Sequence, residues 1–228
     1  MRPRTVAAAL ILSSGLVAPA SVAAASTSPS ALGHARTELL RLSDLPPGWT
    51  TSPASNSNNT TGDAQIAKCL GVPTSFITYN PPQVSSPEFD QRSAGLSVND
   101  SIAIFPNATI LAAQYRLFAS AKTVACFSQV FNSPALKSAL ARQIGPGATV
   151  GHMVVTRAPR PPGRDRGAAV QLVIPVTANG TSLTITMQEV IIVSGLRAVT
   201  LNLVSALGLP FPATLTSHLE AVSAQRLR

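Results

Sequence analysis

The C-terminal third of the chain alternates apolar and polar residues with a period of two. Residues 168–177 and 181–193 carry this alternation and flank Asn179-Gly180. Both residues of that dipeptide tolerate a positive φ, so the sequence predicts a β-hairpin with a two-residue turn. Counting outward from the turn gives three facing pairs, Val176 with Leu183, Ile174 with Ile185, and Leu172 with Met187. Because all six residues are apolar, this register predicts one buried face.

Two residues of the hairpin do not fit a simple apolar face. Pro175 falls opposite Thr184, and because proline has no N–H, we expect the other side of its strand to be unpaired or bulged there. Glu189 falls opposite Val170 on the apolar face, where an unpaired carboxylate is unfavourable. Four interpretations of Glu189 stay open: a pocket carboxylate that contacts a ligand, a salt bridge, exposure at an edge, or a bulge.

Further strands are predicted over residues 150–156 and 196–205, which completes a C-terminal four-strand meander, and a helix over 212–227 closes the chain. The preceding part of the chain has mostly helical spacing. Helices are predicted over 31–43, 63–70, a stretch that follows the N-cap Asn107 and extends to Phe131, and 134–144, with one strand over 93–105. Residues 50–61 are predicted as a loop or frayed strand, and residues 78–87 as a loop. This order predicts an α+β fold, with an antiparallel sheet flanked by helices in a single domain.

The N-terminus has the pattern of a secretory signal peptide. Arg2 and Arg4 precede an apolar run over 6–17, and small residues follow up to Ala25. We expect a signal peptide over 1–25, a flexible tether over 26–30 and one sensor-like domain over 31–228. The apolar run is too short to span a bilayer and has no cysteine, so no transmembrane or lipid anchor is expected after cleavage. The predicted location is secreted, in the extracellular or cell-wall space.

The charge pattern adds one candidate binding surface. The formal net charge is +8, which favours anionic partners, although export makes nucleic acid an unexpected one. Arg157, Arg160, Arg164 and Arg166 are set among prolines with a single acid, Asp165. This loop is a candidate for binding an anionic envelope component, and a solvated hairpin loop is the alternative.

The two cysteines are Cys69 and Cys126, and in an exported protein they predict one disulfide. No C-x-x-C motif is present, and two cysteines with three scattered histidines predict no metal site and no cofactor.

Motifs that carry chemistry are missing from the sequence. It contains no G-x-S-x-G, H-E-x-x-H, P-loop or Rossmann glycine pattern. Trp49 follows a Pro-Pro-Gly turn and is expected to fill the edge of the core, with a ligand contact as the alternative. No catalytic residue is therefore predicted.

Four features resemble those of actinobacterial exported sensor-like domains, which include the extracellular domain of a mycobacterial serine/threonine kinase and related secreted or lipid-anchored proteins. They are Leu42-Ser43-Asp44-Leu45-Pro46-Pro47-Gly48-Trp49, Lys68-Cys69-Leu70-Gly71, Ala125-Cys126-Phe127, and the long C-terminal strands that end in a helix. The resemblance implies an antiparallel sheet flanked by helices, with a cleft proposed to receive a ligand. This chain differs from the kinase in having no kinase domain and a single cysteine pair, and the resemblance supplies no catalytic residues.

Together these observations predict an exported, non-catalytic ligand-binding or sensor-like domain of the bacterial cell envelope. Its partner is expected to be a small amphipathic ligand or an anionic envelope component. Two alternatives stay open. One is a secreted hydrolase, which needs His152 or His218 beside a serine and an acid, and the other is a wall-associated or host-interacting structural protein.

Overall fold

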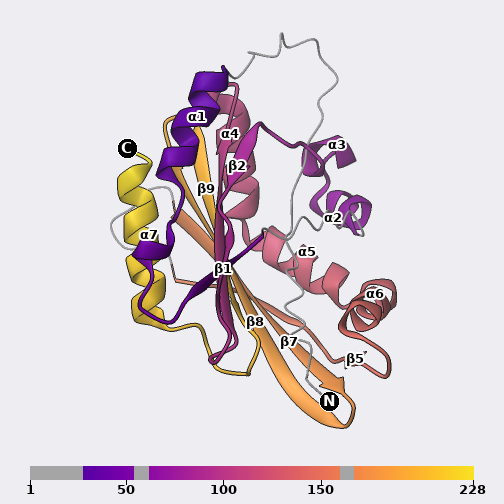
Figure 1. Cartoon of the computed structure of the whole chain (residues 1–228). Helices are drawn as coiled ribbons and strands as arrows, with labels where there is room; N and C mark the ends of the chain where they lie inside the picture. The colour runs from indigo at the N-terminus through magenta and orange to yellow at the C-terminus, as the bar shows by residue number, and fades with distance from the viewer. Residues whose placement is uncertain (1–27, 54–61, 160–166) are drawn as a thin grey trace.

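A computed structural model describes residues 28–53, 62–159 and 167–228 of the chain and confirms the α+β fold (Figure 1). The helices of the described residues are α1 (Pro29–Glu38), α2 (Asp63–Leu70), α3 (Thr74–Ile77), α4 (Ala108–Phe118), α5 (Ala121–Phe131), α6 (Pro134–Ile144), α7 (Ala213–Arg226) and the short 3-10 helix η1 (Leu42–Asp44). The strands are β1 (Thr50–Ser52), β2 (Gln83–Ser85), β3 (Glu88–Gln91), β4 (Leu96–Ile104), β5 (Thr149–Val150), β6 (Val154–Arg157), β7 (Gly167–Ala178), β8 (Thr181–Ser194) and β9 (Arg197–Ser205).

All these strands form one antiparallel sheet, which is larger than the predicted four-strand meander. The order is β1-β3-β4-β9-β8-β7-β5, with β2 also paired to β4 and β6 also paired to β7. The N-terminal strands join the sheet through β4, which pairs with β9 along its whole length. β2 and β3 were not predicted, because strands of three or four residues beside prolines are too short to show a period.

The predicted hairpin register is confirmed pair by pair in β7 and β8. Asn179 and Gly180 have φ values of 51° and 75°, as a two-residue turn with positive φ requires. The strand predicted over 150–156 is instead two strands, β5 and β6, which pair with β7 on either side of Pro175. The missing N–H of Pro175 explains this break, and its carbonyl accepts the Gly151 N–H at 2.8 Å.

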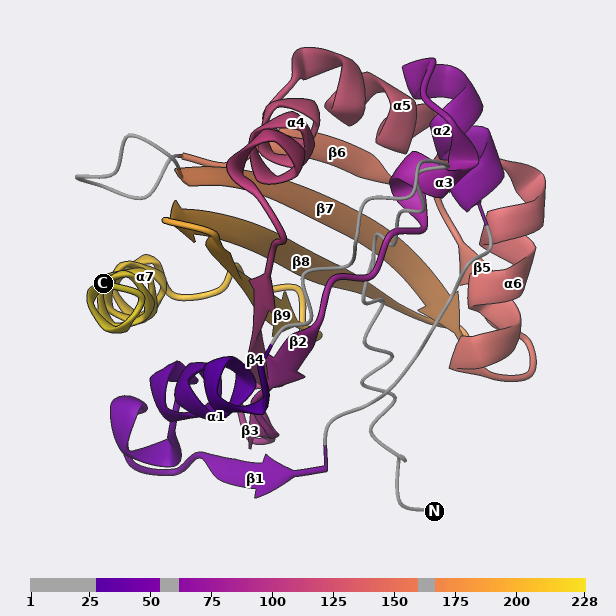
Figure 2. The same cartoon turned by 90° about the horizontal axis from the view of Figure 1, so that it is seen from above.

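Helices cover both faces of the sheet (Figure 2). The odd-numbered side chains of β8 face α2, α4, α5 and α6, and we call this side the α5 face. The even-numbered side chains of β8 face α1 and α7, and we call this side the α7 face. Each face has its own apolar core, which includes Phe127, Leu172 and Ile174 on the α5 face and Val190, Leu201 and Leu219 on the α7 face.

One predicted helix ends earlier than its apolar spacing indicates, and another is divided in two. The first ends at Glu38 instead of residue 43, because Leu39 becomes extended and the Leu40 N–H donates to the buried Asp100 carboxylate at 3.2 Å. The central stretch is interrupted between α4 and α5, where Ser120 caps the second helix by accepting the Thr123 N–H.

The predicted disulfide is confirmed. Cys69 on α2 and Cys126 on α5 are bonded, with their Cα atoms 5.7 Å apart. The bond fastens α2 to the helix that packs directly on the α5 face.

Candidate ligand-binding site

The site begins with one row of residues that crosses four strands on the α5 face. Val170 of β7 pairs with Glu189 of β8, which pairs with Asn202 of β9, which pairs with Asn99 of β4. Residues that pair directly across strands share a face, so the three polar side chains lie in line. The Asn202 side-chain amide donates to Asn99 Oδ1 at 2.9 Å, which holds the middle of the row in place.

This row marks a change in the chemistry of the α5 face. On β7 and β8 the face is apolar, with Leu172, Ile174, Ile185 and Met187 packed under α5 and α6. In the middle of β9 and β4 the same face carries mainly polar residues, which include Ser97, Asn99, Ser101, Thr200 and Asn202. Glu189 therefore lies at the boundary between an apolar and a polar half of one surface.

A small pocket opens at this boundary. Its apolar lining residues are Phe127, Phe131, Val170, Leu172, Met187, Leu203 and Val204, and its polar ones are Gln188, Glu189 and Asn202. The two phenylalanine rings come from successive turns of α5, with their centroids 5.5 Å apart. The volume in which a water molecule can be placed is about 30 Å³, so the pocket admits a small chemical group and not a whole large ligand.

Glu189 is the titratable group of this pocket. Burial raises the pKa of its carboxyl to about 7, because the low dielectric of the apolar walls disfavours the charged form. Among the described residues no hydrogen-bond or ion-pair partner satisfies this carboxyl. Near neutral pH it therefore exists in both forms, and the charged form is ready to accept a hydrogen bond from a ligand.

The structure does not bring the other sequence candidates to this pocket. The Arg157 guanidinium donates to the Ala119 carbonyl at the end of α4. Arg160, Arg164 and Arg166 lie outside the described residues. Trp49 has an exposed fraction of 6% and packs in the core of the α7 face, with its ring centroid 6.4 Å from that of Phe211. This position agrees with the core role expected from the sequence.

Glu189 is a candidate from the sequence, whereas the residues that surround it in the pocket are not. Asn202 gives no local signal, because Leu201 and Leu203 face the other side of the sheet and Asn202 occupies an ordinary alternating position of β9. Phe127 and Phe131 belong to the apolar stripe of α5, and nothing in that stripe separates pocket walls from ordinary core. Only the pairing of β8 with β9 places Asn202 beside Glu189.

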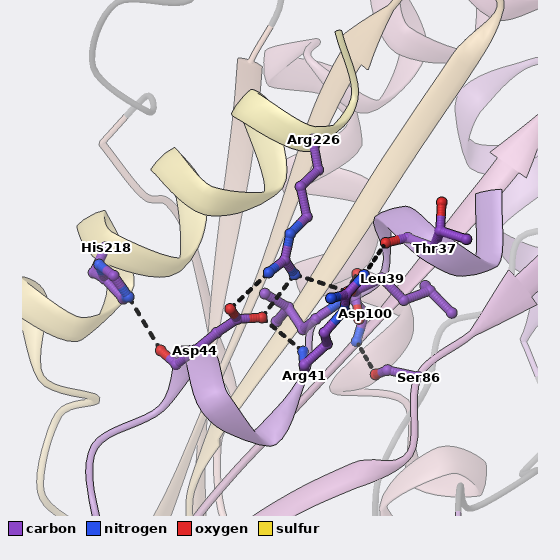
Figure 3. A network of polar contacts seen from close by, with 9 residues as sticks. Thr37, Leu39, Arg41, Asp44, Ser86, Asp100, His218 and Arg226 are labelled. Atoms are coloured by element: carbon purple, nitrogen blue, oxygen red, sulfur yellow. Dashed lines mark hydrogen bonds and ion pairs between the residues drawn. The ribbon is translucent and has the colours of Figure 1, made fainter. Parts of the chain in front are cut away.

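A second group of charged residues lies on the α7 face, and it holds chain segments together (Figure 3). Arg226 of α7 donates to both carboxylate oxygens of Asp44 at 2.7 Å and to the Leu39 carbonyl at 2.9 Å. Burial alone raises the pKa of Asp44, but the hydrogen bonds from Arg226 and the Arg41 N–H outweigh it, and the pKa is lowered overall. Burial raises the pKa of Asp100 to about 6, against the hydrogen bonds that it makes with Ser86 and the Leu40 N–H.

None of the three histidines has contacts that place it beside both a serine and an acid in the described residues. His218 contacts the Asp44 carbonyl oxygen at 3.1 Å, His34 lies 3.1 Å from Glu38, and His152 is exposed. Within residues 28–53, 62–159 and 167–228, no three His, Cys, Asp or Glu side chains form a group suited to a metal ion.

No helix in the described part of the chain combines the length and the apolar character needed to cross a membrane.

Comparison with known proteins finds structural likeness only. No family model and no curated protein sequence matches the chain. The extracellular domain of PknH from Mycobacterium tuberculosis is similar at 11% identity and a TM-score of 0.42, over 88% of this chain and 97% of that chain. LpqN, described as involved in cell envelope biogenesis of Mycobacterium tuberculosis, is similar at 14% identity and a TM-score of 0.29, over 78% of this chain and 75% of that chain. Both agree with the resemblance noted from the sequence, and no pocket residue is assigned from either.

Proposed function

We propose that the protein is an exported, non-catalytic binding domain that receives a small amphipathic ligand in the pocket over Glu189. The observation that carries this proposal is a carboxyl group without a partner, set by strand register among apolar pocket walls. A half-buried carboxyl among apolar walls is disfavoured in its charged form unless a hydrogen-bond donor satisfies it. A ligand that donates a hydrogen bond supplies the donor that the Glu189 carboxylate lacks.

The pocket restricts the chemistry of that ligand. Its small volume accepts an end group such as a hydroxyl or an amine, which Glu189 and Asn202 can bind. The phenylalanine rings of α5 and the Met187 side chain offer apolar contact to the carbon atoms next to that end group. An alcohol or amine at the end of an apolar chain has this combination of properties.

The composition of the pocket supports binding without turnover. Glu189 is the titratable residue among its lining residues, and no serine, cysteine, lysine or histidine from the described part of the chain lines it. Nucleophilic catalysis needs a nucleophile next to a base, and this pocket offers a single acid. The anionic envelope component is the less favoured partner, because Arg157 is already engaged with the Ala119 carbonyl.

The proposal is tested by following backbone amide NMR signals of the purified protein during titration with 1-octanol, octylamine and octanoate. At pH 8 octanol and octylamine are expected to shift the signals of residues 187–190 and 202–204. Octanoate is expected to bind less, because its charge repels that of Glu189. Loss of one charge-assisted hydrogen bond in Glu189→Gln is expected to weaken octylamine binding about tenfold.

Glu220→Gln is the matched control for this titration. Glu220 is a buried carboxyl of α7 whose pKa is also raised to about 7 by burial, and it does not line the pocket. Its substitution is expected to leave octylamine binding unchanged. Equal binding to the wild type and Glu189→Gln, or shifts confined to residues outside the pocket, contradict the proposal.

A further inference from the structure

The connection between β9 and α7 exposes two leucines at one end of the molecule. Leu207 has an exposed fraction of 57% and Leu209 one of 63%, the highest among the large apolar side chains of the described residues. Pro210, next to them, is also exposed, whereas Phe211 turns back into the core beside Trp49. Single exposed leucines are common on protein surfaces. Two neighbouring ones indicate a binding surface only if the loop holds them in place.

The backbone of this loop is fixed at three points. The Ala206 N–H donates to the Gly95 carbonyl at 2.8 Å, and the Gly208 N–H donates to the Thr184 carbonyl at 2.9 Å. The Ser205 hydroxyl donates to the Leu209 carbonyl. Both leucines are therefore held at the surface by an anchored loop.

Leu207 is also seated on the turn between β3 and β4. A Cβ atom added at Gly95 would lie 2.5 Å from Leu207 Cγ, so the turn can approach this closely only as glycine. The same turn carries Arg92, which is exposed, and the neighbouring Asp90 carboxylate accepts the Ser52 hydroxyl at 2.7 Å. Contact with Gly95 thus brings Leu207 to the turn that carries the exposed Arg92.

The surrounding sequence is uncharged. No Asp, Glu, Lys or Arg occurs between residues 198 and 219, and the whole chain has a net charge of +8. A narrow loop with two projecting leucines offers far less area than the roughly 800 Å² per partner of a stable protein–protein interface. A bilayer receives individual apolar side chains without needing a complementary surface, and its anionic headgroups attract a basic protein.

We infer that the 206–210 loop is a membrane-contact site for an anionic lipid bilayer. Leu207 and Leu209 enter the boundary between headgroups and acyl chains, and Arg92 lies at the level of the lipid phosphates. Two leucines bury little apolar area, so the contact is weak and reversible. This contact is independent of the ligand pocket on the α5 face.

The test measures co-sedimentation of the purified protein with vesicles of phosphatidylglycerol and phosphatidylcholine, and with vesicles of phosphatidylcholine alone. The wild type is expected to bind the anionic vesicles more strongly. The double variant Leu207→Ser/Leu209→Ser is expected to bind them about tenfold more weakly, because both apolar side chains are lost. Arg92→Gln is expected to bind about threefold more weakly and with a smaller dependence on salt.

Leu196→Ser is the matched control, because Leu196 is 42% exposed in the turn that precedes the other end of β9. It is expected to bind like the wild type, and thermal unfolding should show that every variant is folded. Unchanged binding of the double leucine variant overturns the inference, as does an equal loss in Leu196→Ser. A concentration-dependent dimer that the double variant abolishes, without vesicle binding by the wild type, also overturns it in favour of a second copy of the chain.

Discussion

Asp44 on the α7 face and Glu189 on the α5 face are acidic residues with opposite surroundings. On the α7 face, Asp44 is paired with Arg226 and the Asp100 carboxylate accepts the Leu40 N–H. On the α5 face, the Glu189 carboxyl lies in a pocket without a partner in the described residues. One carboxylate is therefore satisfied within the protein and the other is not, because their neighbours differ.

The charge of Asp44 stabilises the fold through Arg226, whereas the charge of Glu189 is available to a ligand. The ion pair on the α7 face joins segments that are distant in sequence, Asp44 after α1 and Arg226 in α7. Glu189 joins no segments, and removal of its charge is not expected to loosen the fold. The α5 face is fastened instead by apolar packing and by the disulfide between α2 and α5.

Of the changes that test this comparison, loss of the disulfide is expected to lower the free energy of unfolding most. The double variant Cys69→Ser/Cys126→Ser opens a loop between cysteines that are 57 residues apart in sequence. In the chain-entropy account, this lowers the free energy of unfolding by about 4 kcal/mol. Urea denaturation measures the change, and the wild type under reducing conditions should show the same loss. Unchanged stability in both cases would show that apolar packing alone keeps α2 and α5 in place on the α5 face.

The ion pair on the α7 face gives the next largest effect. Arg226→Gln leaves the Asp44 carboxylate without its bidentate partner and the Leu39 carbonyl without a donor. We expect the free energy of unfolding to fall by about 2 to 3 kcal/mol, because the pair is only partly buried and its hydrogen bonds to charged groups are lost. Arg228→Gln is the control, since Arg228 is exposed at the end of the chain. Equal stability of the two variants would remove the structural role assigned to this pair.

The pH dependence of stability gives the smallest effect and tests the unpaired carboxyl directly. The pKa of Glu189 is raised from 4.5 to about 7 by burial, so the folded state binds its proton more tightly than the unfolded state. This contribution is fully present below pH 4.5 and is lost as pH rises through 7. The opposite holds for Asp44, whose lowered pKa gives stability that is lost as pH falls below 3.8.

Glu189→Gln should therefore become more stable relative to the wild type as pH rises. We expect the difference in unfolding free energy between the two proteins to change by about 2 kcal/mol from pH 5 to pH 8. Denaturation at both pH values, with Gln188→Ala as a neutral control on the same strand, measures it. A constant difference across this range would mean that Glu189 has a satisfied carboxyl, contrary to the geometry.

Much of the fold could be predicted from local patterns. The register of β7 and β8 follows from the Asn179-Gly180 turn, and the Asn107 cap and the cysteine pair were also predicted correctly. The errors have tertiary causes. The end of α1 depends on the distant Asp100 carboxylate, and the division between β5 and β6 depends on Pro175 in the neighbouring strand.

The sequence by itself determined the α+β class, the hairpin register, the disulfide and the placement of Glu189 on an apolar face, because each depends on spacing within a short segment or on a unique pairing. The tertiary structure alone decided that Asn202 stands beside Glu189, that α5 supplies the pocket walls, and that Leu207 rests on Gly95. These contacts join residues from separate elements. Their geometry is fixed by which strands pair and which helix covers them, and no local period records that information.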